Sequence, residues 1–564
     1  MILAADTQLR LDANGVDYLL IALYFVFVLG IGILARRSVS SSLDFFLSGR
    51  SLPAWVTGLA FISANLGAVE IIGMSANGAS YGLPTVHYFW IGAVPAMLFL
   101  GLVMMPFYYG SKVRSVPEFM KRRFGPAAHL VNALSFALAQ LLIAGINLFL
   151  LASIVEMLLG WPLWVSLLTA AAIVLSYTAL GGLSAAIYNE VLQFFVIVAA
   201  LLPLTLVGLN RVGGYDGLKE KITASGGAEQ LSSWPGTSLT EIDNPVLAVI
   251  GIVFGLGFVL SFGYWTTNFV EVQRAMASDS ISAAQRSPII GAFPKMLVPF
   301  IVILPGMIAS VLVNEIAGPK ASGGQPDYNN ALLYLMRDLL PNGMLGVAIA
   351  GLLASFMAGM AANVSAFNTV FSYDLWQSYV VKDRPDDYYT TVGRIATAGA
   401  TVVAIGTATF AASYSNIMDY LQTLFGFFNA PLFATFILGM LWKRMTPTAG
   451  WVGLVAGTGA ALVVAVLSDG TLGGLSLGVI GLSGQGASFA AAGAAFVVDI
   501  VLSILVSLVT SPKPETELRG LVYSLTPKAD FRDANAPQLA WFQQPTKLAG
   551  IGLAAVVALN IMFW

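Results

Sequence analysis

Charged side chains inside long apolar stretches are the residues of this sequence best able to do chemistry. Glu70 and Lys295 each lie well inside such a stretch. If the stretch crosses a bilayer, a charge there costs at least ~2.5–3.5 kcal/mol and needs a compensating role. Glu70 could accept hydrogen bonds from a solute, carry a proton, or pair with Lys295 or a hydroxyl. Lys295 could line a solute site or extend its ammonium group to the membrane surface.

Three further acidic residues lie near the ends of apolar stretches, where contact with water explains them: Glu156, Glu190 and Asp419. The chain has no cysteine, and His87 and His129 alone are too few for a zinc site. No phosphate-binding loop and no nucleophile beside a base is visible. The sequence therefore gives no support to an enzymatic reaction or ATP hydrolysis. The net charge of −2 gives no support to a nucleic-acid partner.

The composition places these residues in a membrane. Of the 564 residues, 57% are hydrophobic and 10% are charged, with a mean hydropathy of +0.81, whereas a soluble domain carries roughly 25% charged residues. A helix crosses the hydrocarbon core with about 20 apolar residues. Runs of this kind predict an all-α polytopic membrane protein with about 14 transmembrane helices. The predicted spans are 16–35, 53–76, 85–109, 127–158, 162–181, 186–209, 244–273, 288–314, 343–373, 391–412, 415–441, 447–468, 488–510 and 548–564.

The distribution of basic residues predicts the orientation. Most lysines and arginines fall in alternate loops, and cytoplasmic loops are the ones that retain positive charge. Because the predicted number of spans is even, we expect both termini outside and a cytoplasmic loop at 511–547. We expect an integral plasma-membrane protein that contacts the lipid bilayer and functions as a monomer.

Two of the predicted spans are interrupted by small and polar residues. The first carries Ala64-Asn65-Leu66-Gly67-Ala68, directly before Glu70, and the second carries Gly255-Leu256-Gly257 and Ser261-Phe262-Gly263. Unwound backbone inside a membrane is tolerated only where it lines an enclosed cavity, so these segments could mark a binding site. The alternative is that glycine is simply common in membrane helices, where it allows close packing.

The order and separation of several motifs carry a resemblance to a known family. The motifs are Asp44 to Pro53, Ala64 to Gly67 and on to Gly73-Met74, Ser115 to Phe119, Tyr177 to Ala185, Gln273 to Ala277, and Leu441 to Arg444. Over roughly residues 15–510 the chain resembles the solute:sodium symporter family, which includes the sodium/glucose cotransporters.

The resemblance implies a LeuT-like fold, in which an inverted repeat relates two five-helix units and the solute site lies between two broken helices. The expected organisation is an N-terminal segment with the first helix (1–52), a first repeat (53–210), an extracellular loop (211–243), a second repeat (244–442) and three C-terminal helices (443–564).

The resemblance also implies a sodium site. Carried over position by position, its ligands would be the backbone carbonyls of Ser63, Leu66 and Ser355, together with two adjacent hydroxyls. Ala358 and Gly359 stand where those hydroxyls belong, so two oxygen ligands are missing, and the hydroxyl of Ser355 could compensate. Sodium is therefore the expected coupling ion, while proton coupling and uncoupled transport stay open.

The solute site implied by the resemblance to the sugar-transporting branch has six positions. Glu70 replaces an amide, Phe89 replaces a carboxylate, and Ser261 replaces an asparagine. Tyr264 would shield the solute from the cytoplasm. The six positions are Glu70, Phe89, Ser261, Tyr264, Lys295 and Gln422.

We therefore expect a secondary active symporter that moves a small polar solute into the cell with a cation, with a sugar or sugar derivative favoured and sodium as the ion. The alternatives are a proton-coupled or sodium-coupled transporter of a monocarboxylate, an amino acid or a nucleoside. An uncoupled facilitator is a further alternative, and so is a sensor built on the same fold.

Overall fold

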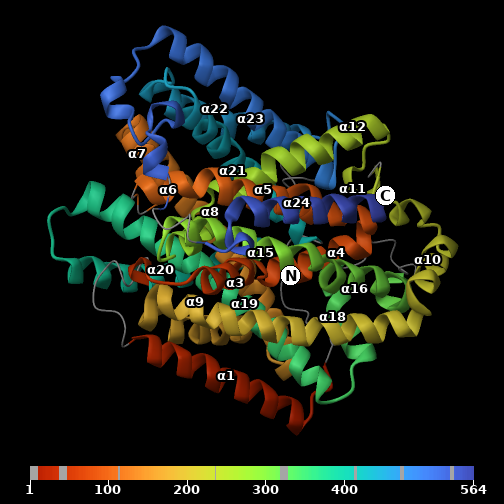
Figure 1. The fold of residues 1–564 in the computed structure, drawn as a ribbon. Helices are drawn as coiled ribbons and strands as arrows, with labels where there is room; N and C mark the ends of the chain where they lie inside the picture. Colours follow the sequence, from red (N-terminus) through yellow and green to blue (C-terminus); the bar gives the residue numbers. More distant parts are fainter. Residues whose placement is uncertain are drawn as a thin grey trace.

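The computed structural model describes residues 11–36, 48–111, 113, 115–234, 237–317, 328–411, 416–469, 476–531, 533 and 539–564. Within these ranges the chain is helical, and the strand-like pairing found there is an isolated bridge between Leu52 and Ser278. Many of the long helices run side by side across the view of Figure 1. The prediction of an all-α protein is confirmed.

In chain order, the α-helices are α1 (Gly15–Arg36), α3 (Ala54–Asn65), α4 (Ala68–Tyr81), α5 (Val94–Phe99), α6 (Met105–Ser111), α7 (Val116–Phe124), α8 (Pro126–Leu159), α9 (Leu163–Val212), α10 (Gly214–Ala224), α11 (Thr237–Thr240), α12 (Pro245–Ile250), α13 (Phe262–Thr267), α14 (Phe269–Met276), α15 (Ile281–Leu297), α16 (Pro299–Leu312), α17 (Asn314–Ala317), α18 (Ala331–Leu339), α19 (Met344–Thr369), α20 (Asp386–Ala411), α21 (Ile417–Leu441), α22 (Pro447–Leu467), α23 (Gly484–Val509) and α24 (Pro545–Met562). Wider π-type turns form η3 (Tyr88–Ala93), η4 (Leu100–Met104), η6 (Gly251–Ser261) and η8 (Val370–Val380).

Eleven of the described helical segments are long and apolar enough to cross a membrane, or up to 12 if the bent pair α3 and α4 forms one span. Shorter apolar helices cover Gly15–Ile31 and Leu163–Ile173, within two more of the predicted spans. The structure therefore supports a polytopic protein with 11 or 12 candidate spans, and the remaining two spans of the expected 14 stay predictions.

The loop expected between two of the predicted spans is helical. The spans expected at 162–181 and 186–209 fall within the single helix α9, Leu163–Val212, of 50 residues. The sequence between them contains Gly181 and Gly182, which weaken a helix without removing a hydrogen bond as proline would. At 1.5 Å per residue such a helix follows a path of roughly 75 Å, so it is much longer than the hydrocarbon core is thick.

The first predicted interruption is confirmed. Helix α3 ends at Asn65, Leu66 leaves the helical region with a ψ of 43°, and extended Gly67 leads into α4. The two helices are bent by 53° at this break. The last carbonyls of α3 therefore have no helical N–H ahead of them.

The second interruption is displaced from the predicted position. Both glycine-rich segments, 255–257 and 261–263, are helical, and the chain leaves the helix at Asn268, whose side chain accepts the N–H of Val270 and caps α14. The glycines serve packing instead, since a β-carbon at Gly255 would lie 2.9 Å from Cβ of Phe489.

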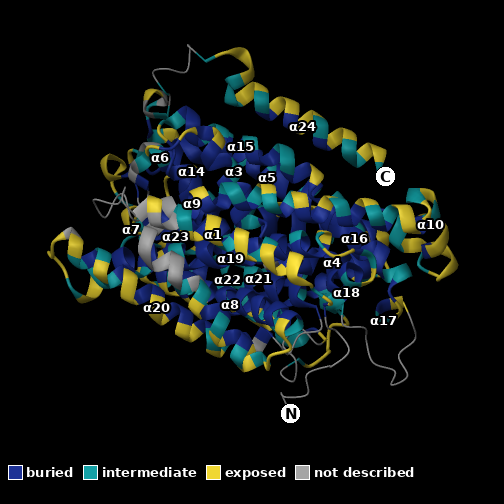
Figure 2. Cartoon of the chain, turned by 90° about the horizontal axis from the view of Figure 1, so that it is seen from below, coloured by how far each residue is buried: buried dark blue, intermediate teal, exposed yellow. Residues whose placement is uncertain are grey.

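The break regions lie in the centre of the molecule. In the most apolar 18-residue segment of α19 and its continuation η8, 89% of the residues are buried. The corresponding share in α24 is 17%. Figure 2 shows the same contrast, with exposed residues along α24 and α20 and buried residues around α3, α4 and α19. Helix α19 packs against both halves of the first broken helix.

Candidate functional site

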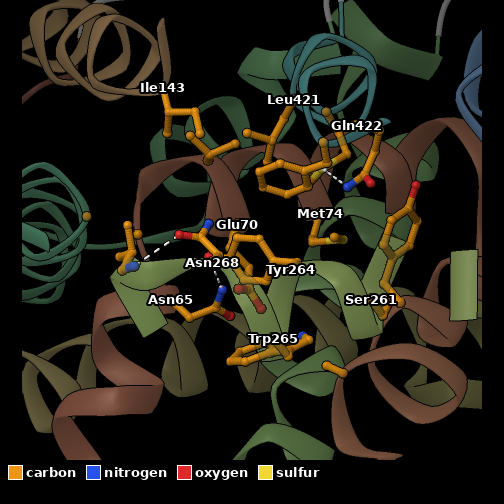
Figure 3. Close-up of a pocket in the computed structure, with 18 of the residues that line it drawn as sticks. Asn65, Glu70, Met74, Ile143, Ser261, Tyr264, Trp265, Asn268, Leu421 and Gln422 are labelled. Atoms are coloured by element: carbon orange, nitrogen blue, oxygen red, sulfur yellow. Dashed lines mark hydrogen bonds between the residues drawn. The ribbon is translucent and has the colours of Figure 1, made fainter. Parts of the chain in front are cut away.

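A central cavity lies between the two broken helices. Its walls come from α3 and α4, from η3, η6 and α13, and from α8, α15, α19 and α21, and the empty space among them, including its mouth, is about 830 Å³. Pockets for small molecules combine apolar walls with a few placed polar groups, and the residues that line this cavity are of both kinds. In Figure 3, Asn65, Tyr264 and Trp265 come together on one side, and Leu421 and Gln422 approach from the opposite side.

Glu70 and Lys295 form an ion pair at this cavity. Both side chains are buried, with 8% and 2% of their surface exposed. The ammonium group of Lys295 also donates a hydrogen bond to Asn65 and lies 4.9 Å and 5.1 Å from the ring centroids of Phe89 and Trp265. The alternative in which Lys295 extends to the membrane surface is therefore wrong, and the pairing of Glu70 with Lys295 is confirmed.

A chain of hydrogen bonds continues from this pair. Nδ2 of Asn65 donates to the hydroxyl of Tyr264 at 3.0 Å, and that hydroxyl donates to Oε1 of Glu271 at 2.7 Å. Glu271 is fully buried, and its Oε2 has no hydrogen-bond partner among the described residues. The hydroxyl of Tyr264 thus joins the cavity to a buried carboxylate on α14.

A second buried ion pair lies beyond Glu271. Arg274 of α14 contacts both oxygens of Glu190 on α9, at 2.7 Å and 3.4 Å, and neither side chain is exposed. The expectation that water satisfies Glu190 is therefore wrong, because an arginine inside the protein does so instead.

The structure brings all six predicted solute positions to the wall of the cavity. Phe89 comes from η3, Ser261 from η6, Tyr264 from α13, and Gln422 from α21. The amide nitrogen of Gln422 donates to the sulfur of Met418 at 3.3 Å. The roles of these residues in binding remain predictions.

The two helices that carry the predicted sodium positions, α3 and α19, are in contact near the break. A β-carbon added at Gly359 of α19 would lie 3.2 Å from Cα of Gly67, so α19 touches the break of the first helix backbone to backbone. The hydroxyl of Ser63 is fully buried without a partner among the described groups, and that of Ser355 donates to the carbonyl of Leu352 at 2.8 Å. Free carbonyls and an unpartnered hydroxyl are oxygen ligands of the kind that a hard cation prefers, so these residues fit a sodium ion.

Five further polar residues line or adjoin the cavity without having been assigned a role from the sequence: Asn65, Asn147, Asn268, Glu271 and Asn363. Their common signal is a polar side chain in the middle of an apolar run, which membrane helices rarely expose to lipid. Sequence alone shows that such a residue needs a partner, but it does not show which helix provides one.

A family model described as the sodium:solute symporter family matches residues 45–457. The sodium/glucose cotransporter of Vibrio parahaemolyticus is 30% identical over 464 residues, which cover 79% of this chain and 84% of the relative. The human sodium/glucose cotransporter 4 is 30% identical over 490 residues, which cover 82% of this chain and 71% of the relative.

Two solved structures share the fold. A Na+-coupled sialic acid symporter, in a substrate-bound outward-open state, superposes with a TM-score of 0.74 at 18% identity and covers 88% of this chain and 98% of its own. Mhp1, a nucleobase-cation-symport-1 family transporter, superposes with a TM-score of 0.52 at 15% identity. The match covers 85% of this chain and 97% of the Mhp1 chain. Both have the LeuT-like fold expected for this chain. Because the family model spans most of the chain and the relatives align over most of both sequences, the chain belongs to the sodium:solute symporter family.

Proposed function

We propose that this protein is a sodium-coupled symporter for a small neutral polyhydroxylated solute, with a sugar or sugar derivative as the substrate class. The observation that carries the proposal is the Glu70–Lys295 pair in the wall of a central cavity between two broken helices. The family supports symport, and the names of the relatives at 30% identity support a sugar.

The paired charges favour a neutral solute. Glu70 and Lys295 neutralise each other, so a carboxylate or an ammonium solute would have to displace one partner from a buried ion pair, which costs about 3–5 kcal/mol. Hydroxyl groups can instead donate to the carboxylate and accept from the ammonium group without separating them. The rings of Phe89, Trp265 and Phe425 line the same cavity and offer apolar faces to a sugar ring.

Sodium would bind where α3 ends against α19, with the carbonyls of Ser63, Leu66 and Ser355 as ligands. Sodium and solute would then shift the population between outward-open and inward-open states, provided that they bind the two states unequally. In this proposal residues 53–210 and 244–442 form the two inverted repeats, 211–243 joins them outside the cell, and 1–52 and 443–564 complete the chain. Both termini face outward, and one chain is the transporting unit.

A specific observation favours proton coupling as the second candidate. Glu271 is buried and forms no ion pair within the described residues, because the nearby Lys295 and Arg274 already pair with Glu70 and Glu190. A buried carboxylate without a cationic partner tends to hold a proton. Glu271 would then carry the coupling charge.

Uptake into proteoliposomes tests both candidates. Labelled glucose, galactose, lactate, proline and uridine are supplied under an imposed sodium gradient or, separately, an imposed proton gradient. Accumulation of a sugar above its external level under the sodium gradient alone supports the proposal. Accumulation under the proton gradient alone supports the second candidate, and uptake that only equilibrates would refute both. Gramicidin, which collapses both gradients, is the control.

A further inference from the structure

We propose that the side-chain oxygen of Asn147, on α8, is a ligand of the coupling cation and takes the place of a hydroxyl absent from α19. The inference rests on the proposed sodium coupling and concerns how this chain completes the ion site. No position on α8 belongs to the ligand set that the family resemblance implies.

The amide of Asn147 is oriented by its own helix. The side chain is 3% exposed, and its Nδ2 donates to the carbonyl of Ile143 at 3.1 Å. Turning the amide over would set two oxygens against each other, so the hydrogen bond fixes which atom points away from α8. Oδ1 is that atom, and it has no hydrogen-bond partner among the described groups. Burying an amide oxygen without a partner is unfavourable, and a bound cation would satisfy it.

Oδ1 points at the junction of the broken helix and α19. A β-carbon built on Gly359 would lie 2.9 Å from it, and one built on Gly67 would lie 3.6 Å from it. The amide of Asn147 therefore fills the volume that a serine side chain at position 359 would need. The oxygen missing from α19 and the oxygen that Asn147 offers from α8 would therefore occupy neighbouring space.

The other groups at this junction are also oxygens. Ser63, one turn before the break, is fully buried and its hydroxyl has no partner within the described residues. The last carbonyls of α3 are free of helical hydrogen bonds. Asn147 and Gly359 both line the cavity, so a cation bound here would lie next to the solute space. Sodium is a hard cation, and hard cations are bound by oxygen ligands such as these amide, hydroxyl and carbonyl oxygens.

Helix α8 supplies its own control. Oδ1 of Asn132 is also buried without a partner among the described groups, and its side chain is likewise 3% exposed. Asn132 is not among the residues that line the cavity. Replacing Asn132 therefore removes the same kind of atom from the same helix while leaving the ion junction intact.

The test measures sodium binding rather than transport. The full chain is purified, and binding of radioactive sodium and sodium-dependent protection against thermal unfolding are followed at constant ionic strength with choline as the replacement cation. Asn147→Ala should raise the sodium concentration for half-maximal binding on the order of tenfold, while Asn132→Ala leaves it unchanged. Asn147→Asp keeps an oxygen at the junction but sets its second oxygen against the carbonyl of Ile143, so sodium binding should weaken less than in Asn147→Ala.

A paired substitution separates loss of a ligand from general damage. Gly359→Ser alone should push the amide of Asn147 out of its place, because its β-carbon would lie 2.9 Å from Oδ1. Combined with Asn147→Ala, it restores the oxygen from α19 and should recover sodium binding toward that of the unsubstituted protein. Unchanged sodium binding by Asn147→Ala would overturn the role of Asn147 and leave sodium coupling standing. Absence of sodium binding by the unsubstituted protein would overturn sodium coupling itself.

Discussion

Breaking the ion pair of Glu70 and Lys295 should destabilise the protein more when one partner is removed than when both are. Glu70→Gln leaves the ammonium group of Lys295 buried without a negative charge beside it, and only uncharged amide oxygens, of Asn65 and of the new glutamine, remain to accept its hydrogen bonds. Removing one partner of a buried pair costs about 3–5 kcal/mol, whereas replacing both by groups of similar volume is often close to neutral. We therefore expect Glu70→Gln and Lys295→Met each to lower the apparent melting temperature strongly, and the double variant to recover much of the loss.

Intrinsic tryptophan fluorescence during heating of the detergent-purified protein measures this, since Trp265 lies 5.1 Å from the ammonium group. The double-variant cycle isolates the coupling from the separate effects of the two substitutions. Melting temperatures that fall additively in the double variant would show that the pair is not coupled in the folded protein. Lys121→Met, on the exposed surface of α7, is the control for loss of a positive charge as such.

Three further outcomes are expected. Tyr264→Phe leaves both hydrogen-bond partners of the hydroxyl unpaired and should cost about 1–3 kcal/mol of stability, measured by the same unfolding assay, together with a changed rate of solute release. Gly306→Ala places a β-carbon 1.9 Å from a carbonyl of α4 and should prevent normal folding, whereas Gly399→Ala, with no atom within 4 Å, should fold normally in a size-exclusion assay. Outside the spans, burial raises the pKa of Glu315, but the hydrogen bond from Arg337, a backbone hydrogen bond and the charge of Arg337 together lower it by more, so the net pKa lies below its usual value. The pair therefore stabilises at neutral pH and loses its contribution, less than about 1 kcal/mol, as the pH falls through that lowered pKa; Glu315→Gln should remove this acid dependence.

The position of the first helix break could be predicted because the local sequence disfavours a helix by itself. Asn65, Leu66 and Gly67 interrupt the run, and the chain bends by 53° there. The second break was misplaced because glycine has two uses in a membrane helix. Gly257, for example, lies where a β-carbon would meet the side chain of Ile91 at 2.9 Å, so it reflects packing between helices. Only the capping amide of Asn268 marks the true end.

The site could be predicted as a set of positions but not as a network. The resemblance places six residues at one cavity, and the structure brings them there. The partners within the network, such as Glu271 for Tyr264, depend on how α13 and α14 turn about Asn268. A sequence of apolar residues with one carboxylate does not fix that turn, so Glu190 was wrongly assigned to water.

The balance of buried charge argues for cation dependence over an uncoupled facilitator. The polar network from the cavity to α9 contains three buried carboxylates, Glu70, Glu271 and Glu190, and two buried cations, Lys295 and Arg274. With a proton on Glu271 the network is neutral, but whenever Glu271 is ionised it carries one negative charge in excess, in a region where a low effective dielectric makes such a charge costly. A monovalent cation entering the cavity would lower that cost and leave with the solute. A neutral solute alone would not, so its binding should be weaker whenever the cation is absent.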